Sequence, residues 1–271
     1  MSRYAKIVAL VMVAALAIAV LGLAGCNTTT EETTETKPEV KLVTPGQLTV
    51  GSDTAFPPFE SMNGDVAEGF DVDLMGAIGK EMGISKVVFK TEIFDTLIPT
   101  LKAGGKFDVI ASGMTIKADR AKEIDFCDPY FDSNQSLAMK TGGKYSVPAD
   151  MSGKKVGVQS GTTGESWATE NLKPAGATIV PFKDAVAAFA ALQAGNVDAV
   201  VNDLPVTAEM VKDTTKGLAM ITQIPTGEQY GFAVSKDNPE LKTAINAALA
   251  KVKSSGEYTT IYKKWFGVEP L

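Results

Sequence analysis

The sequence predicts an α/β fold made of two related units, and three observations lead to this prediction. From Pro45 onward, short β-rich runs alternate with helical patterns, as in α/β units with largely parallel sheets. Segments 101–113 and 192–203 both read as a helix end, a glycine, a short loop, an aspartate, an apolar strand and a polar strand end. A chain of 271 residues, 45% hydrophobic, is long enough for two such lobes.

The first 25 residues have the layout of an export signal. Arg3 and Lys6 precede a long apolar run that ends in small residues before Cys26. This stretch resembles a bacterial lipoprotein signal, which predicts that residues 1–25 are removed and that Cys26 carries the lipid. A retained membrane anchor is the alternative, because the run is nearly long enough to span a bilayer.

Residues 26–44 are expected to form a tether. The segment is repetitive in threonine and glutamate, and it contains Pro38. Such a composition buries too little apolar surface to fold by itself. We therefore expect a folded body, from residue 45 on, that is held near a membrane.

Composition excludes several classes of function. Removing Arg3 and Lys6 with the signal moves the formal net charge from -6 to -8, and no basic patch is present, so nucleic acid is not an expected partner. The chain has no histidine, which excludes Ser-His-Asp catalysis and imidazole metal sites. With Cys26 used as an anchor, Cys127 is predicted to be a buried apolar side chain rather than a disulfide partner.

Polar residues follow four of the predicted strands. In open α/β sheets, ligands bind outside the carboxyl ends of the strands. These strand ends carry serine and threonine hydroxyls, glycines, the Gln159 amide and two aspartate carboxylates. They lie in segments 51–54, 112–115 and 159–163 and at Asp203. They predict a polar cleft without an obvious catalytic group.

Arg120 is the most informative single residue. It lies near the predicted start of a helix, where the helix dipole disfavours a cation. An arginine can hold a carboxylate through two parallel hydrogen bonds, and backbone N–H groups near Thr115 would add to an anion site. The alternative is a surface ion pair with Asp119, Glu123 or Asp125.

Other polar and aromatic residues complete a predicted site for a ligand with adjacent anionic and cationic groups. Thr162 and Thr163 open a second helix and would offer N–H groups, although Thr162 with Glu165 also fits a simple capping box. Asp203 would pair with an ammonium group, or else serve as a turn or cap residue. Phe56 and Phe94 would form apolar walls, or else belong to the core.

The order of these motifs identifies a resemblance. "VGSDTAFPPFE", "GFDVDLMGAIGKEMG", "DVIASGMTIKADRAKEIDFCDPY", "VGVQSGTTGE" and "VVNDLP" resemble the family 3 extracytoplasmic solute-binding proteins, the polar amino acid receptors of ABC importers. The resemblance runs from Gln47 to Gly267. It implies a type II periplasmic-binding-protein fold, with two α/β lobes joined by two hinge crossings and the ligand in the interlobe cleft.

The resemblance also implies the domain division and the site. The crossings are expected near residues 130–135 and 226–231, so that lobe 1 comprises 45–130 and 231–271, and lobe 2 comprises 131–230. No catalytic residue, metal or cofactor is expected. The expected ligand-binding residues are Asp53, Phe56, Phe94, Ser112, Gly113, Thr115, Arg120, Gln159, Thr162, Thr163 and Asp203.

Within that set, the resemblance assigns the α-carboxylate to Arg120 and Thr115 and the α-ammonium to Asp203. Asp53 and Gln159 would contact the side chain of the ligand and select among amino acids. Because Asp53 is an acceptor and Gln159 carries no positive charge, an acidic ligand would meet an unpaired carboxylate. Arginine, lysine, histidine or glutamine is therefore the expected ligand.

The expected partners are an ABC permease with its ATPase, and a membrane reached through the N-terminal lipid. The protein would be exported, and lipid-anchored to the outer face of the cell membrane or in the periplasm. The rival is a cyclohexadienyl dehydratase-like enzyme with Glu165 or Asp53 as general acid, which would need a raised pKa that the sequence gives no reason to expect. A sensory domain is a third class, and we expect a free-standing receptor instead.

Overall fold

The computed structural model describes residues 40–142 and 149–270, within a compact unit, Pro38–Leu271. The predicted signal peptide 1–25, the predicted lipid attachment site Cys26 and most of the predicted tether lie outside the described residues. At the end of the tether, Val40 and Leu42 pack against the core, and the Val43 N–H donates to Asp108. The folded body therefore begins before residue 45.

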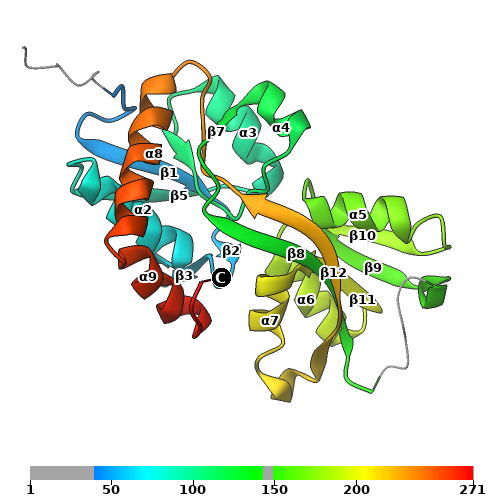
Figure 1. Cartoon of the computed structure of the whole chain (residues 1–271). Coiled ribbons are helices and arrows are strands. Elements are labelled where there is room, and N and C mark those ends of the chain that lie inside the picture. The colour runs from blue at the N-terminus through cyan, green and yellow to red at the C-terminus, as the bar shows by residue number, and fades with distance from the viewer. Residues whose placement is uncertain (1–39, 143–148, 271) are drawn as a thin grey trace, which may run out of the picture. The chain divides into compact units, whose positions relative to one another are not determined.

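The first lobe is built on a five-stranded sheet in the order β5-β1-β6-β13-β7 (Figure 1). β1 pairs in parallel with β5 and β6, whereas β13 is antiparallel to β6 and β7. Because β13 follows the second lobe in the chain, both ends of the body contribute to this sheet. Its strands are β1 (Gln47–Ser52), β5 (Lys86–Thr91), β6 (Val109–Ile110), β7 (Asp125–Phe126) and β13 (Ala233–Val234).

Helices cover this sheet with their apolar faces. In α2 the buried residues Phe70, Leu74 and Ile78 recur at helical spacing and join one core cluster with Leu48. Cys127 belongs to the same cluster and is buried as a free thiol, as predicted. The helices are α2 (Phe70–Glu81), α3 (Phe94–Ala103), α4 (Ala118–Glu123), α8 (Pro239–Ser254) and α9 (Glu257–Phe266).

A small antiparallel sheet of three strands follows β1. Its order is β2-β3-β4, and its short strands carry Phe56 and Glu60 on the side of the first lobe that bears the site. The strands are β2 (Ala55–Phe56), β3 (Glu60–Asn63) and β4 (Val66–Glu68).

The second lobe repeats the plan with a sheet in the order β10-β9-β11-β8-β12. β9 is parallel to β10 and β11. Asp184 caps α6 by accepting the Ala187 N–H, and Gly195 ends that helix in the left-handed conformation. The elements are β9 (Lys155–Gln159), β10 (Thr178–Phe182), β11 (Ala199–Asp203), α5 (Thr163–Asn171), α6 (Ala185–Ala194), α7 (Leu204–Met210), η2 (Ala149–Met151) and η3 (Thr214–Lys216).

Two long strands connect the lobes. β8 (Phe131–Lys140) and β12 (Leu218–Tyr230) run antiparallel to each other, from the second sheet toward the first lobe (Figure 1). Their register shifts between Ile224 and Glu228, where the Asn134 side chain accepts the N–H groups of Thr226 and Gly227. This bulge therefore lies beside the polar residues that project from the ends of the other strands.

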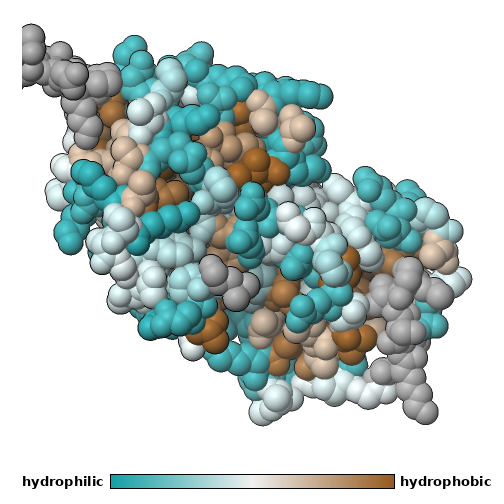
Figure 2. All heavy atoms as spheres, in the orientation of Figure 1, coloured by the Kyte–Doolittle hydropathy of each residue, from teal (hydrophilic) through white to brown (hydrophobic). Residues whose placement is uncertain are grey.

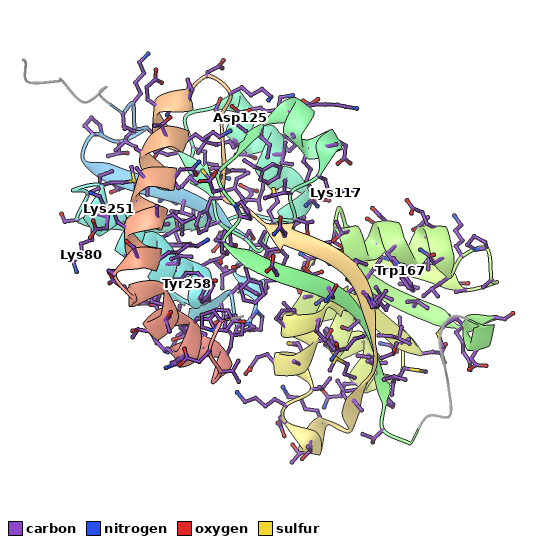
Figure 3. All side chains as sticks on the ribbon, in the orientation of Figure 1. Lys80, Lys117, Asp125, Trp167, Lys251 and Tyr258 are labelled. Carbon is purple, nitrogen blue, oxygen red and sulfur yellow. The ribbon has the colours of Figure 1, made fainter. Side chains whose placement is uncertain are left out.

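An aromatic cluster anchors the connecting strands to the first lobe. Phe131 of β8 and Tyr230 of β12 pack on Phe59, with ring centroids 4.9 and 5.2 Å away. Phe70 and Phe266 extend the cluster on the side of α9, where Figure 3 marks Tyr258. Buried aromatic pairs of this kind add about 0.5–1.5 kcal/mol each beyond area burial, so this end of the connection is held firmly.

Hydrophobic residues form separate patches among hydrophilic ones on the face drawn in Figure 2. This distribution follows from the helices turning their apolar sides to the sheets. In the described parts of the chain, no helix combines the length and the apolar character needed to cross a membrane.

Candidate ligand-binding site

Eight of the eleven sequence-predicted residues line one small cavity, whose volume is about 10 Å³. The wall from the first lobe comes from β2, the start of α3, and the loop that leads from β6 to α4. The wall from the second lobe comes from the start of α5 and the end of β11. The lining residues are Phe56, Phe94, Gly113, Thr115, Arg120, Thr162, Thr163 and Asp203.

Arg120 reaches across the two lobes. Its Nη1 donates to the Thr115 carbonyl at 2.8 Å, and its Nη2 donates to the Gly161 carbonyl at 3.0 Å. The guanidinium carbon lies 5.3 Å from the centre of the Phe94 ring. Burial lowers the pKa of Arg120, and the charges of Asp119, Asp203 and Glu228 oppose that shift.

The surface ion pairs considered for Arg120 do not form. Asp119 lies 3.5 Å from Lys117, and its Oδ1 accepts only the backbone N–H of Arg120. Glu123 pairs with Lys102, and Asp125 pairs with Lys236 at 2.7 Å. Each of these carboxylates has a lysine partner, which leaves the Arg120 guanidinium in the cleft.

Asp203 occupies the N-cap position of α7, but its side chain makes no capping bond. Instead, its oxygens accept from Gln135 Nε2 and from the Tyr230 hydroxyl. Burial, together with the neighbouring Glu228, raises the pKa of Asp203 to about 7. The buried carboxylate is therefore short of positive charge, which is the environment an ammonium group would improve.

Glu228 joins the two sides of the cleft from β12. Its Oε2 accepts from the hydroxyls of Thr115 and Thr163, both at 2.7 Å. Its Oε1 accepts from Gln135 Nε2 at 3.1 Å. The same glutamine amide therefore contacts both Asp203 and Glu228.

Asp53 and Gln159 meet across the cleft, next to the cavity rather than in its lining. Gln159 Nε2 donates to Asp53 Oδ2 at 2.5 Å, and both side chains are buried. Burial, reinforced by the charge of Asp184, raises the pKa of Asp53 to about 7. This raised pKa is not apparent from the sequence, because it arises from burial of the carboxyl between the two lobes.

The two phenylalanines are both core residues and cavity walls. Phe56 and Phe94 belong to separate hydrophobic clusters of the first lobe, and both line the cavity. Gly113 lies against Phe56 with a φ of 51°, and a Cβ there would stand 2.8 Å from the ring. Only glycine fits this close approach without strain.

A pair of buried acids supports the loop behind the cavity. Ser112 donates to Glu60 Oε1 at 2.9 Å and accepts the Asp53 N–H. Asp71 Oδ2 accepts the Gly113 N–H at 3.0 Å and the Tyr130 hydroxyl at 2.7 Å. Burial raises the pKa of Asp71 to about 7. Burial, together with the neighbouring charge of Asp71, raises the pKa of Glu60 well above its ordinary value. Ser112 and Glu60 thus position the wall instead of lining it.

The start of α5 combines a helix cap with a cavity wall. Thr162 Oγ1 accepts the Glu165 N–H at 3.2 Å, and Glu165 Oε2 accepts the Gly161 N–H at 2.7 Å. The capping interpretation of this motif is therefore correct, and Thr162 and Thr163 also line the cavity. Thr115, however, precedes α4 and forms a β-bridge with Tyr230, so it does not stand at the helix start as expected.

Comparison with known families agrees with this architecture. Residues 48–268 match the family described as bacterial extracellular solute-binding proteins, family 3. The chain belongs to this family. Family 3 is extracellular by that description, which agrees with the predicted export.

Individual relatives are similar over nearly the whole body. A probable histidine-binding protein of Neisseria gonorrhoeae is 38% identical over 263 residues, covering 94% of this chain and 95% of the relative. An ancestral arginine-binding protein solved with arginine is 43% identical, with a TM-score of 0.78 over 82% of this chain and 99% of that one. The ancestral amino acid-binding protein AncCDT-1, a precursor of cyclohexadienyl dehydratase, is 37% identical, with a TM-score of 0.75 over 82% and 96% of the two chains. The type II fold of family 3 is therefore shown for this chain.

Sequence reasoning missed three residues at the site: Gln135, Glu228 and Tyr230. Glu228 and Tyr230 are two positions apart on β12, so their side chains leave the strand on the same face. The predicted crossing at 226–231 contained both of them, and the alternation in "GEQYG" was the signal that could have identified them.

Proposed function

We propose that this protein is the receptor of an ABC importer and binds an L-amino acid with a basic or amide side chain. One observation carries this proposal: Arg120 and Asp203, groups of opposite charge from different lobes, face a single cavity with backbone and hydroxyl donors around them. Among the residues that the structure describes, neither group forms an ion pair with a side chain of opposite charge. A zwitterion with an adjacent carboxylate and ammonium would supply both partners.

In this proposal the guanidinium of Arg120 and the N–H groups near Thr115 and Thr163 hold the α-carboxylate. Asp203 accepts from the α-ammonium, and its pKa falls again as the added positive charge favours the ionised form. Phe56 and Phe94 enclose the aliphatic part of the ligand. The cleft thus recognises what all amino acids share.

The side chain of the ligand would point toward Asp53. A carboxylate there suits a cationic or amide donor, and it would repel an acidic side chain in the desolvated cleft. Names of two similar proteins, a probable histidine-binding protein and an arginine-binding protein, support the same class of ligand. The proposed ligands are arginine, lysine, histidine and glutamine.

Binding would act through closure of the lobes. The lobes would divide at residues 130 and 231, with lobe 1 formed by 40–130 and 231–271 and lobe 2 by 131–230. Contacts from Thr163 and Asp203 would stabilise the closed state, which then delivers its ligand to a permease driven by an ATPase. The lipid on Cys26 would keep the receptor at the membrane.

A dehydratase-like enzyme is the second candidate, and one observation favours it. Asp53 has a pKa raised to about 7, which would let it hold a proton near neutral pH, and AncCDT-1 is a similar protein. Glu165 suits the acid role less well, because its carboxylate accepts the Gly161 N–H at the start of α5. Similar proteins named as binding proteins favour the receptor.

A thermal unfolding screen of the full-length protein tests the proposal against this rival. The screen covers the twenty L-amino acids and prephenate, since a ligand at 100 times its Kd stabilises the folded state by about 2.7 kcal/mol. We expect shifts with basic or amide amino acids that are lost in Arg120→Ala and in Asp203→Ala. Turnover of prephenate without any amino acid shift would overturn the receptor in favour of the enzyme.

A further inference from the structure

Glu228 is a polar residue of the cleft that the proposed ligand contacts do not use. Its carboxylate accepts three hydrogen bonds: from Thr115 and Thr163 at 2.7 Å each, and from Gln135 at 3.1 Å. Two of these donors share a single oxygen, Oε2. A carboxylate that accepts this many bonds is held in one position.

The donors come from three separate segments. Thr115 follows β6 in the first lobe, Thr163 is the first residue of α5 in the second lobe, and Gln135 lies on β8. Glu228 itself lies on β12, directly after the bulge in the connecting strands. Movement of α5 away from the first lobe would therefore separate Thr163 from an oxygen that Thr115 also contacts.

Glu228 stands beside the cavity rather than in it. Thr115 and Thr163 line the cavity, and they also line a neighbouring surface groove to which Glu228 contributes. Figure 3 marks Lys117 and Trp167, which line this groove from the first lobe and from α5. The carboxylate thus closes the wall between cavity and groove, and its bonds to the two threonines do not involve a ligand.

The charge of Glu228 also acts on the site. It raises the pKa of Asp203 and opposes the lowering of the pKa of Arg120. Such a charge repels the α-carboxylate of a ligand, so a purely electrostatic role would weaken binding. The hydrogen bonds from Thr115 and Thr163 would strengthen binding instead, because they hold the two lobes together in the closed cleft.

We propose that Glu228 is a positioning residue that bridges the lobes through Thr115 and Thr163, and so stabilises the closed cleft before the ligand adds its own contacts. The proposal rests on the proposed function as an amino acid receptor. Since apparent affinity scales with the fraction of protein in the binding-competent state, a bridge that needs no ligand strengthens binding. The effect belongs mainly to the dissociation rate, which opening of the lobes limits.

Four variants of the full-length protein separate this role from a general structural one. Glu228→Ala removes the bridge, whereas Glu228→Gln keeps an acceptor for the threonines. Thr163→Val removes one hydroxyl and leaves the backbone N–H in place. Glu170→Ala is the matched control, because it removes an exposed carboxylate from the same groove without touching the threonines.

Dissociation constants and dissociation rates for L-arginine and L-glutamine are the readout. We expect Glu228→Ala to weaken binding about tenfold or more, mainly through faster dissociation, as for the loss of charge-assisted hydrogen bonds. Glu228→Gln should recover most of this loss, and Glu170→Ala should bind as the wild type does. Thr163→Val should weaken binding less, and adding it to Glu228→Ala should cost nothing further.

A measurement without ligand keeps this test separate from the proposed function. Fluorophores on Asp65→Cys and Lys173→Cys, two exposed positions on different lobes, report lobe separation in a Cys26→Ser background in which Cys127 is buried. Glu228→Ala should increase the separation in the ligand-free protein, even if no amino acid binds to the wild type. The proposed bridge is overturned if Glu228→Ala binds as tightly as the wild type or more tightly. It is also overturned if the losses of affinity from Glu228→Ala and Thr163→Val add in the double variant, or if Glu228→Ala leaves the lobe separation unchanged.

Discussion

The two ends of the binding site are built in different ways. At the end that would hold the amino acid backbone, Arg120, Asp203 and Glu228 are tied to donors and acceptors from both lobes and both connecting strands. At the end that would face the side chain, Asp53 accepts one hydrogen bond from Gln159 across the cleft and one from the backbone N–H of Ala55.

This difference separates two tasks. The crowded end has its geometry fixed by many bonds, so it would read a feature that does not vary among amino acids, the carboxylate beside the ammonium. At the simpler end, one side chain can be exchanged without dismantling the rest. Selectivity among amino acids would therefore change through Asp53 and Gln159, while the ability to bind amino acids depends on Arg120 and Asp203.

The largest effect is expected at Arg120. Arg120→Ala should weaken binding of every amino acid ligand by roughly 10²- to 10³-fold, because the α-carboxylate would lose its charged partner in a desolvated site. Arg120→Lys should restore only part of the loss, since a lysine cannot form two parallel hydrogen bonds. Calorimetric titration measures both variants. Affinity should fall by the same factor for arginine and for glutamine. A loss confined to one ligand would contradict the assignment of Arg120 to the shared α-carboxylate.

A smaller, selective effect is expected at Asp53. With a pKa of about 7, this carboxyl is largely protonated at pH 6 and largely ionised at pH 8. The ratio of affinities for arginine over glutamine should therefore rise about tenfold over this range, as the ionised fraction does. The ratio cancels the parallel titration of Asp203, which acts on both ligands. Asp53→Asn should make the ratio independent of pH, and a flat profile in the wild type would contradict this role.

The acids behind the cavity should affect stability instead of selectivity. Unfolded carboxyls titrate near pH 4, whereas the pKa of Asp71 is raised to about 7, so the folded state holds a proton that the unfolded chain releases. The free energy of unfolding should thus fall as the pH rises from about 4 to about 7, and then level off.

Urea denaturation without ligand at pH 5 and pH 8 measures that trend. Asp71→Asn should make the loss of stability between the two values smaller, because the variant lacks one of the titrating groups. Asp65→Asn, at an exposed turn between β3 and β4, is the control and should behave as the wild type. An undiminished pH dependence in Asp71→Asn would show that this carboxyl does not titrate as described.

The smallest effect concerns the helix cap in the cavity wall. Thr162→Ala removes the hydroxyl that accepts the Glu165 N–H, and should lower the free energy of unfolding by about 1 kcal/mol. Urea denaturation at neutral pH measures this change. Affinity should fall less than in Arg120→Ala, since the cap orients α5 without providing a charge. A loss of binding as large as that of Arg120→Ala would mean that Thr162 holds the ligand directly.

Much of the fold was predictable because its signals are local. The helix that Thr162 and Thr163 were expected to open is α5, and the glycine expected after a helix end in segment 192–203 is Gly195, which ends α6. The start of α4 was less predictable: the Ile116 N–H pairs with the carbonyl of Gln229, more than a hundred residues away, and this delays the helix to Ala118. A tertiary hydrogen bond of this kind leaves no trace in local sequence.

The site, like the fold, contains residues that the local sequence predicted and others that only tertiary contacts bring into place. Asp203 and the threonines were predicted because they follow strands whose ends meet in such folds, and Arg120 because it lies near a predicted helix start. The structure brings them around one cavity. Gln135, Glu228 and Tyr230 were missed because each acts through a partner from a distant segment. The raised pKa of Asp53 could not be predicted from the sequence either, since it depends on burial between the two lobes.

The most direct test of the central claim compares L-arginine with agmatine, which is arginine without its α-carboxylate. Calorimetric titration of the wild type and of Arg120→Ala with both compounds gives the four affinities needed. If Arg120 holds the α-carboxylate, the wild type binds arginine at least about 100-fold more tightly than agmatine, and Arg120→Ala removes most of that preference. Equal binding of both compounds by the wild type would contradict the account.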